Sequence, residues 1–323
     1  MEINEYMKGI RKELSVSASD MEKIANDFIT EMRAGLEGGT SSLKMLPSYI
    51  GKPTGKEKGS VVAIDFGGTN VRILQADLDG SGKITVNAKN KFPLVDPDGK
   101  YNYTAKEATG EQLFDYIAEH VSEISIKGVE NSLGHTFSFP CKQNGINSAE
   151  LIYWTKEIKT SGVEGHDVSK ILEGSLKRKK IENVTPKAVI NDTVGTLLAA
   201  AYSNTDVDMA AICGTGHNAC YLEPNHPLTG KPMIVNIESG NFNKVPQSRF
   251  DVLIDAASER PGLQKLEKMI SGYYLGEIIR VILEQMMKDG VLSESKEILK
   301  KDVIYGADID NIIADSADFG ATA

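Results

Sequence analysis

The sequence predicts an α/β protein made of two lobes. Its 323 residues exceed the size of most single domains, which contain about 50 to 250 residues. Apolar residues make up 41% of the chain and charged residues 25%, which is typical of a soluble globular protein. Strand-like and helix-like patterns alternate along the chain, and two turns rich in Gly and Thr each separate a pair of strand-like runs. Such alternation indicates helices packed against sheets.

The N-terminal residues 1–34 are predicted to be mostly helical. Their apolar side chains recur at intervals of three and four, at Met21, Ile24, Phe28 and Met32. A segment rich in Gly, Lys and Pro at 51–60 is expected to connect the lobes. The remaining predicted elements are helices at 111–123, 193–203 and 263–287 and strands at 130–140 and 187–192.

A β-hairpin is predicted at 61–76, because β-branched runs flank a Gly-Gly turn. In a Walker loop or a dinucleotide fold the glycines lead into a helix, so the hairpin indicates neither. The turn can direct consecutive backbone N–H groups at a phosphate. Asp65 before the turn is suited to hold Mg²⁺ through water, although an ordinary tight turn explains the pattern equally well. The turn consists of Gly67, Gly68, Thr69 and Asn70.

A second hairpin of the same kind is predicted at 210–222 and is a candidate internal repeat. Its turn contains Gly214, Thr215 and Gly216. Two such hairpins in the two halves of one chain suggest related lobes that hold a phosphate from opposite sides.

Asp192 lies where a predicted strand ends and a predicted helix begins. Asp and Asn are common helix N-caps, so capping alone explains this position. Catalytic groups also gather at strand ends that face a cleft in open α/β sheets. A carboxylate there can accept the proton of a hydroxyl that attacks a phosphorus atom. The position of Asp192 by itself favours the role of a helix cap over a catalytic role.

Composition argues against several classes of partner. The net charge of −9 argues against nucleic acid, because binding along a phosphate backbone needs a surplus of Lys and Arg. The basic run 177–180 is more often a solvated face than a binding patch. The sequence contains no run of about 18 apolar residues, the length that would predict a membrane span. Residues 1–16 lack the apolar core of a signal peptide. We therefore expect a cytoplasmic protein without a membrane partner.

The cysteines and histidines predict no metal or redox centre. The three cysteines cannot all pair with one another, and none is spaced as CxxC. We interpret Cys141, Cys213 and Cys220 as buried small apolar side chains in a reducing compartment.

Successive sequence blocks resemble the eukaryotic-type hexokinase and glucokinase family. They are SSLKMLPSYI (41–50), DFGGTNVR (65–72), LGHTFSFPC (133–141), YWTKEIKTSGVEGHDV (153–168), VINDTVGTLLAAAY (189–202), CGTGHNACYLE (213–223) and PGLQKLEKMISGYYLGEIIR (261–280). The blocks stand in the family's order, and the resemblance covers about residues 20 to 285. It implies a ribonuclease H-like, actin-type sugar kinase fold with two lobes and a central cleft. The small lobe is predicted at 59–190 and the large lobe at 1–58 and 191–323.

The resemblance also implies roles for individual residues. Asp192 takes the proton from the sugar hydroxyl, while Lys156 and Arg72 stabilise charge on the transferred phosphoryl group, with a salt bridge as the alternative role of each cation. Thr69 and Thr215 hold the nucleotide phosphates. A ring of Asn, Glu, Asp, Ser and Thr suits a hexose, whose hydroxyls both give and accept hydrogen bonds. The implied sugar contacts are Ser138, Thr155, Lys156, Asn191, Asp192, Asn218, Glu238 and Glu267.

The chain departs from the family pattern at two places. Ser239 follows the pocket glutamate where the family usually has Trp. The Ser-Thr-Arg helical segment and the Val-Asp-Gly turn that hold adenosine in the family do not follow the SGYYLGE block. Without them, apolar surface on the helix at 263–287 is expected to be exposed, which favours dimerisation.

The sequence therefore predicts a hexokinase that uses ATP and Mg²⁺. The reaction would transfer the γ-phosphoryl group to the C6 hydroxyl of glucose or a related hexose, the entry step of glycolysis. The alternative is a catalytically weak or inactive hexokinase-like protein that binds glucose and acts as a regulator. An actin-like or chaperone-type ATPase is a third possibility, against which the sugar-contact residues argue. The protein is expected to be a monomer or a homodimer.

Overall fold

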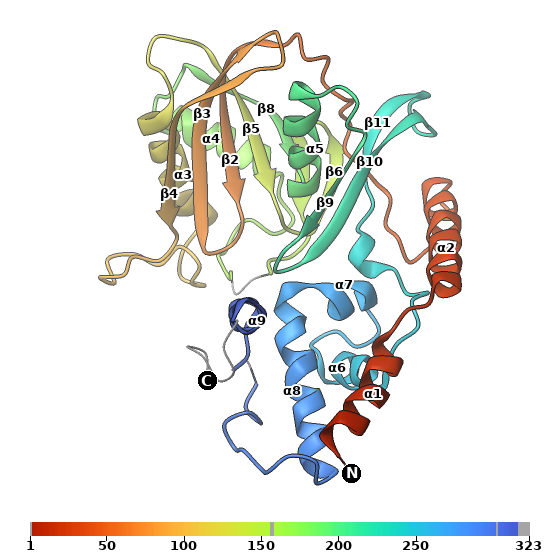
Figure 1. Ribbon diagram of the computed structural model, residues 1–323. Coiled ribbons are helices and arrows are strands. Elements are labelled where there is room, and N and C mark those ends of the chain that lie inside the picture. Colours follow the sequence, from red (N-terminus) through yellow and green to blue (C-terminus); the bar gives the residue numbers. More distant parts are fainter. Residues whose placement is uncertain (1, 156–157, 302, 316–323) are drawn as a thin grey trace. The chain divides into compact units, whose positions relative to one another are not determined.

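The computed structural model describes residues 2–155, 158–301 and 303–315 (Figure 1). The chain divides into two compact units, and the predicted lobe boundaries remain a prediction. One unit, called here the terminal unit, comprises residues 1–45, 211–219 and 237–323. The other, called here the central unit, comprises residues 46–210 and 220–236.

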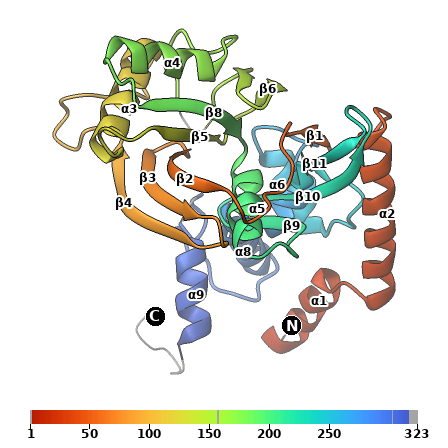
Figure 2. The same cartoon turned by 90° about the horizontal axis from the view of Figure 1, so that it is seen from above.

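A five-stranded mixed sheet lies at the centre of the central unit, in the order β4-β3-β2-β5-β8. β2, β3 and β4 are antiparallel neighbours, whereas β5 and β8 run parallel to β2. Helices α3 and α4 cover one face of the sheet, and α5 lies on the other face (Figure 2). The bounds are β2 (Lys58–Phe66), β3 (Asn70–Asp79), β4 (Ile84–Pro93), α3 (Gly110–Ile124), β5 (Asn131–Phe137), α4 (Val168–Arg178), β8 (Val184–Ile190) and α5 (Asp192–Ser203).

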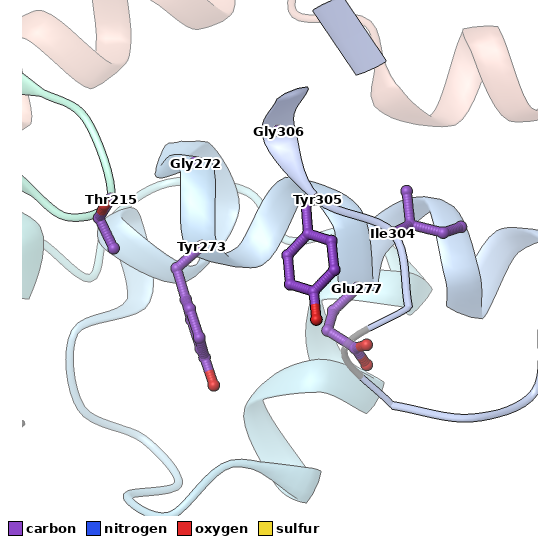
Figure 3. Close-up of a pocket in the computed structure, with 7 residues that line it drawn as sticks. All are labelled: Thr215, Gly272, Tyr273, Glu277, Ile304, Tyr305 and Gly306. Carbon is purple, nitrogen blue, oxygen red and sulfur yellow. The ribbon is translucent and has the colours of Figure 1, made fainter. Parts of the chain in front are cut away.

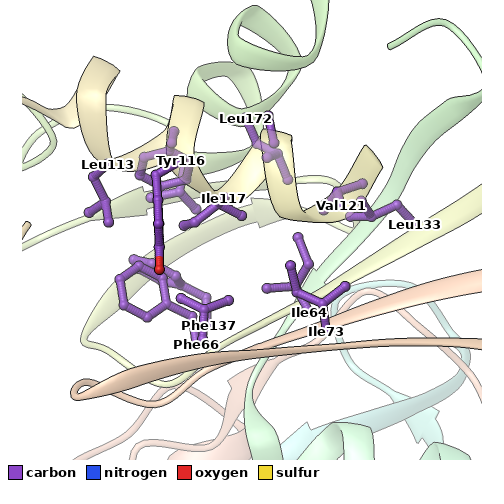
Figure 4. Packing of buried hydrophobic residues seen from close by; sticks show 14 of the residues in the cluster. Ile64, Phe66, Ile73, Leu113, Tyr116, Ile117, Val121, Leu133, Phe137 and Leu172 are labelled. Carbon is purple, nitrogen blue, oxygen red and sulfur yellow. The ribbon is translucent and has the colours of Figure 1, made fainter. Parts of the chain in front are cut away.

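The main hydrophobic core fills the space between this sheet and α3 and α4 (Figure 4). Every second residue of a strand faces the same side, so Ile64 and Phe66 of β2 both point into this core. Leu113 and Ile117 of α3 meet them from the helix side, one helical turn apart. Thr109 begins α3 with a capping box, which satisfies N–H groups that the helix itself cannot pair.

The basic run 177–180 lies at the end of α4 and is partly neutralised by α3. Arg178 forms an ion pair with Asp115, and Lys179 forms one with Glu119. These pairs agree with the interpretation of the run as a solvated helix face.

A four-stranded sheet contains the second predicted hairpin, in the order β1-β11-β10-β9. The tip of the β9–β10 hairpin, residues 211–219, belongs to the terminal unit. Both predicted hairpins are confirmed, and each continues into a third antiparallel strand, β4 after β2–β3 and β11 after β9–β10. The bounds are β1 (Leu46–Pro47), β9 (Met209–Cys213), β10 (His217–His226) and β11 (Lys231–Asn236), and a separate small sheet pairs β6 (Cys141–Gly145) with β7 (Ser148–Leu151).

The terminal unit is mainly helical. Tyr6 and Ile10 of α1 pack with Phe250 of α6 and Met286 of α8 in a small core. In the part of the chain that the structure describes, no helix has the length and apolar character needed to cross a membrane. The bounds are α1 (Ile3–Leu14), α2 (Ala18–Leu36), the 3₁₀ helix η1 (Ser239–Asn241), α6 (Arg249–Ala257), α7 (Lys265–Ile270), α8 (Gly272–Lys288) and α9 (Gly306–Ala314).

The N-terminal residues 1–34 are mostly helical, as predicted, and form α1 and α2. Two other sequence expectations need correction. The helix predicted at 263–287 is two helices, because the extended backbone of Ser271 ends α7 before α8 begins. Cys213 is exposed rather than buried, since it is the last residue of β9 before the turn.

His135 lies in the main core, where it has no ionic or hydrogen-bonding partner among the described residues. It is 1% exposed, and both ring nitrogens lack a hydrogen bond in the described part of the chain. Its ring packs near Phe114 and Phe137. Burial lowers the pKa of His135 from 6.5 to about 3, because the charged form cannot be solvated there.

The buried histidine predicts an acid-sensitive fold. His135 stays neutral in the folded chain, whereas in the unfolded chain it gains a proton below about pH 6.5. The free energy of unfolding is therefore at its full value above pH 6.5 and falls as the pH is lowered toward 3. Between pH 7.5 and 5.5 this loss amounts to about 1.4 kcal/mol. We expect His135→Phe to remove that loss in urea unfolding, whereas His166→Gln on an exposed loop does not. Equal pH slopes for wild type and His135→Phe would contradict this assignment.

Candidate functional site

Three neighbouring parallel strands of the central unit end at the same edge of the sheet. Phe66 of β2 pairs with Phe137 of β5, and Thr136 of β5 pairs with Ile190 of β8. Neighbouring strands lie about 4.8 Å apart, so the residues that follow each strand are brought close together. The residues that follow are the turn 67–70, Ser138, and Asn191 with Asp192.

Asp192 is the first residue of α5 and is half-buried. The N-cap is its neighbour Asn191, whose side chain accepts from the Thr193 N–H at 2.9 Å. Asp192 Oδ1 also accepts from this N–H at 2.9 Å. Since Asn191 already caps the helix, capping does not require a carboxylate at position 192. A negative charge in the first turn is nevertheless stabilised by the helix dipole.

Asp65 and Arg72 form an ion pair within the first hairpin. The two residues are direct cross-strand neighbours, and Arg72 Nη1 lies 2.9 Å from Asp65 Oδ2. The Arg72 side chain is 59% exposed and the Asp65 side chain 43%, and exposed pairs of this kind stabilise a fold by about 0 to 1 kcal/mol. An anion at the adjacent turn can therefore compete for Arg72 at little cost. Gly68 in that turn has a φ of 128°, which favours glycine.

Thr155 is held near the same sheet edge by its neighbour Trp154. The Trp154 ring packs against Phe66, Phe137 and Phe139, near the ends of β2 and β5. Its indole N–H also donates to the Thr160 carbonyl at 2.8 Å. Lys156, predicted to contact both the sugar and the phosphoryl group, lies outside the described residues.

The turn of the second hairpin is attached to the beginning of α8 within the terminal unit. The Gly214 carbonyl accepts from the Gly272 N–H at 2.8 Å, and the Thr215 carbonyl accepts from the Tyr273 N–H at 3.2 Å. In a trans peptide the carbonyl and the next N–H point in opposite directions. The N–H groups of Thr215 and Gly216 therefore point away from α8, an orientation that suits a bound phosphate.

Three predicted sugar-contact residues lie around this turn. Glu267 Oε2 accepts from the His217 N–H at 2.9 Å. Asn218 Nδ2 donates to Glu238 Oε1 at 3.4 Å, and Asn218 Oδ1 accepts from the Ser239 N–H at 3.2 Å. The terminal unit thus brings two carboxylates and one amide together beside the predicted phosphate turn.

His217 and Cys213 flank the same turn. Burial lowers the pKa of His217 from its ordinary value, although the nearby Glu267 partly opposes that effect. Cys213 Sγ lies 3.7 Å from His217 Nδ1. A neutral imidazole nitrogen can accept a hydrogen bond from the thiol, so this pair places no fixed positive charge beside the turn.

A pocket of about 270 Å³ lies within the terminal unit (Figure 3). Tyr273 and Tyr305 line it and are 56% and 61% exposed. No sequence pattern predicts this pocket, because its residues come from the β9–β10 turn, from α8 and from the segment that leads into α9, and neither periodicity nor a motif indicates that these segments meet. The lining residues are Thr215, Gly272, Tyr273, Glu277, Ile304, Tyr305 and Gly306.

The wall of the pocket depends on a close approach at Gly276 of α8. A Cβ atom at this position would lie 1.8 Å from the Ile304 carbonyl oxygen. Only glycine therefore lets the segment before α9 pack against α8. Ile270, Tyr273 and Leu275 are exposed nearby, as expected for the apolar surface of this helical region.

Known sequences match the chain over nearly its whole length. Residues 6–202 and 208–322 match two family models that are both described as hexokinase. Hexokinase-1 of Schizosaccharomyces pombe is 35% identical over 92% of this chain and 64% of its own length. The hexokinase of Kluyveromyces lactis is 36% identical over 94% of this chain and 66% of its own length. The chain thus spans slightly less than two thirds of these relatives.

Solved structures show the same fold. A crystal structure of a hexokinase superposes with a TM-score of 0.82 at 34% identity, over 92% of this chain and 69% of that one. The hexokinase from Schistosoma mansoni, solved in complex with glucose, superposes with a TM-score of 0.79 at 33% identity, over 97% of this chain and 73% of that one. These matches confirm the predicted sugar kinase fold.

The contact at Gly276 predicts a sensitive position for the pocket. Gly276→Ala is expected to push the segment around Ile304 away from α8, because its Cβ would overlap the Ile304 carbonyl. Trypsin should then cleave after Lys300 or Lys301 about 10-fold faster, since cleavage follows local opening. Gly9→Ala in α1, where a Cβ meets nothing within 4 Å, is the matched control. Unchanged cleavage of Gly276→Ala would show that the contact does not hold this segment.

Proposed function

The chain belongs to the hexokinase family, and on that premise we propose that it transfers the γ-phosphoryl group of ATP to the C6 hydroxyl of glucose or a related hexose. The observation that carries the proposal is the shared sheet edge in the central unit. Parallel strands β2, β5 and β8 end together, so the turn 67–70, Ser138 and Asp192 follow neighbouring strand ends. This arrangement supports the proposal, because the residues proposed as phosphate donors, sugar contact and base all follow neighbouring strands of one sheet.

The proposed hexose contacts are polar side chains that the resemblance to the family implies. They are Ser138, Thr155, Asn191, Asn218, Glu238 and Glu267, and Lys156, which lies outside the described residues. Amides and carboxylates of this kind discriminate against sugars that lack a hydroxyl, because an unmatched buried polar group loses its hydrogen bond. The glucose complex of the Schistosoma mansoni hexokinase supports a hexose as substrate.

In the proposed reaction, Asp192 accepts the proton of the C6 hydroxyl while that oxygen attacks the γ-phosphorus. The phosphorus–oxygen bond to ADP breaks and the hexose 6-phosphate forms. Phosphoryl transfer is accelerated mainly by positioning and by charge stabilisation. Arg72 and Lys156 supply positive charge, and the turn residues Thr69 and Thr215 hold the nucleotide phosphates.

Asp65 is the proposed residue for Mg²⁺ binding. Asp65 is the second-last residue of β2, close to the proposed phosphate turn. Its carboxylate is partly exposed and offers the hard oxygen ligands that Mg²⁺ prefers. Mg²⁺ bound there through water would neutralise phosphate charge. The residue types fit, since Arg72 engages Asp65 Oδ2 in an exposed pair that a competing cation can replace.

The pocket of the terminal unit is the proposed site for the nucleoside part of ATP. Thr215 links the pocket to the second phosphate turn. Its volume of about 270 Å³ lies near the lower end of ligand pockets, which suits a nucleoside rather than a whole nucleotide. Tyr273 and Tyr305 present aromatic surface on which a base can stack.

Removing the proposed base is the first test of this function. Asp192→Asn keeps the shape of the side chain but cannot take up the hydroxyl proton. We expect kcat for glucose-dependent ADP release to fall about 10²- to 10⁴-fold, while glucose binding by calorimetry changes little. Asp206→Asn, on an exposed loop after α5, is the matched control.

Two outcomes would contradict the proposal. Turnover unaffected by Asp192→Asn would reject Asp192 as the base. Glucose binding by the wild type without any turnover would favour the alternative, a hexokinase-like regulator that binds sugar.

The nucleoside pocket leads to a separate prediction. Tyr305→Ala should weaken binding of a non-hydrolysable ATP analogue about 5- to 160-fold, because base stacking on an aromatic ring contributes about 1 to 3 kcal/mol. Glucose affinity should stay unchanged. Ile313→Ala on the same helix is the control, since Ile313 is 78% exposed and does not line the pocket. Equal effects of the two substitutions would place the nucleoside elsewhere.

Three finer expectations remain part of the proposal. They are a role at the entry of glycolysis, a cytoplasmic location, and a monomeric or homodimeric state without nucleic-acid or membrane partners. The family relationship supports the first of these.

A further inference from the structure

Glu267 and Lys268 are consecutive residues of α7, a helix of six residues. A helix this short does not hold its own conformation, because nucleation is unfavourable in fewer than about 12 residues. Its entry is also unusual, since Gln264 at the N-cap has a positive φ of 52°. The orientation of α7 must therefore come from contacts with neighbouring segments.

The buried side chain of Lys268 provides several of these contacts, beside the bond from the Leu266 N–H to the Phe242 carbonyl. This side chain is 4% exposed and its ammonium group donates to Asp255 Oδ1 at 2.6 Å. The same group donates to the Arg260 carbonyl at 2.7 Å. Asp255 on α6 in turn accepts from the Gly262 N–H at 2.9 Å. One ammonium thus joins α7, α6 and the loop between them.

The contact with Lys268 favours the charged form of Asp255. Burial alone would raise the pKa of Asp255, but the hydrogen bonds from Lys268 and from the Gly262 N–H outweigh it, so this pKa lies below its ordinary value. A buried ion pair often stabilises a fold no more than apolar residues of similar size would. In some proteins a buried polar or ionic group instead fixes which of several arrangements the chain adopts.

The geometry of a helix connects this pair to Glu267. Consecutive side chains on an α-helix point about 100° apart, so fixing Lys268 toward α6 also fixes the direction of Glu267. Glu267 Oε2 then accepts from the His217 N–H at 2.9 Å. The fit is tight, because a Cβ at Gly216 would lie 2.9 Å from Glu267 Oε2. A rotation of α7 by a fraction of a turn would break this contact.

We propose that Lys268 and Asp255 are positioning residues that set the rotation of α7 and thereby direct the Glu267 carboxylate at the phosphate turn and the hexose. The part that concerns hexose rests on the proposed function. The part that concerns the turn does not, since Glu267 accepts directly from the His217 N–H.

The test replaces the pair in two ways. The double substitution Lys268→Met with Asp255→Leu keeps an apolar filling but removes every polar contact of the two side chains. The double substitution Lys268→Gln with Asp255→Asn removes the charges but keeps hydrogen-bonding groups. The carbonyl of Arg260 and the N–H of Gly262 belong to exposed residues, so water can satisfy them in both variants.

The first readout uses no ligand. Hydrogen exchange at the His217 amide should become about 10-fold faster in the Met/Leu variant, because the hydrogen bond from this amide to Glu267 opens more often. The triple variant that also carries Glu267→Gln should show the same increase. The Gln/Asn variant should exchange nearly as slowly as the wild type. Equal exchange in wild type and the Met/Leu variant, with melting temperatures unchanged, would overturn the proposal.

The second readout is a double-mutant cycle on glucose affinity. If the pair acts through Glu267, the Met/Leu change should weaken glucose binding about 10-fold in the wild type but less than about 2-fold when Glu267→Gln is present. Additive losses would show a general structural role and contradict the proposal. A wild type that binds no hexose would refute the proposed function, while the exchange experiment would still decide the positioning role.

Discussion

The attachment of residues 214–216 to the beginning of α8 is the constraint on which the candidate chemistry of the terminal unit depends. Two backbone hydrogen bonds, from Gly272 and Tyr273, engage the carbonyls of Gly214 and Thr215. Those bonds turn the following N–H groups outward and make Thr215 part of the pocket wall. The contact from Glu267 to His217 completes the attachment. The proposed phosphate turn, the pocket and the proposed sugar-binding carboxylate of Glu267 are therefore all held by the same segment.

Local chemistry made much of the fold predictable. Gly-rich turns between β-branched runs predicted both hairpins, and regular apolar spacing predicted the N-terminal helices and the helix at 111–123. Interruptions within a helical pattern were harder to predict from the sequence. Ser271 interrupts the pattern at 263–287 through its extended backbone, and its apolar neighbours continue the same periodicity on both sides. Periodicity alone does not distinguish one long helix from two short ones.

The candidate site could be predicted only in part from the residue types. Position left Asp192 with capping as the favoured role, and the structure gives the N-cap to Asn191. The Asp65–Arg72 pair could have been anticipated from their facing positions in the hairpin, since they are cross-strand neighbours. The pocket could not have been anticipated in this way. It depends on the close approach of Ile304 to Gly276, and no sequence pattern indicates that these two segments meet. Contacts of this kind are set by tertiary packing.

The most direct test of the account is the product balance of the purified 323-residue chain with ATP and Mg²⁺, measured with and without glucose. Phosphorus NMR would follow ADP and sugar phosphate together. The account predicts equal amounts of ADP and glucose 6-phosphate, with almost no ADP formed when glucose is omitted. ADP formation at the same rate without glucose, or no sugar phosphate from a chain that binds glucose, would contradict it.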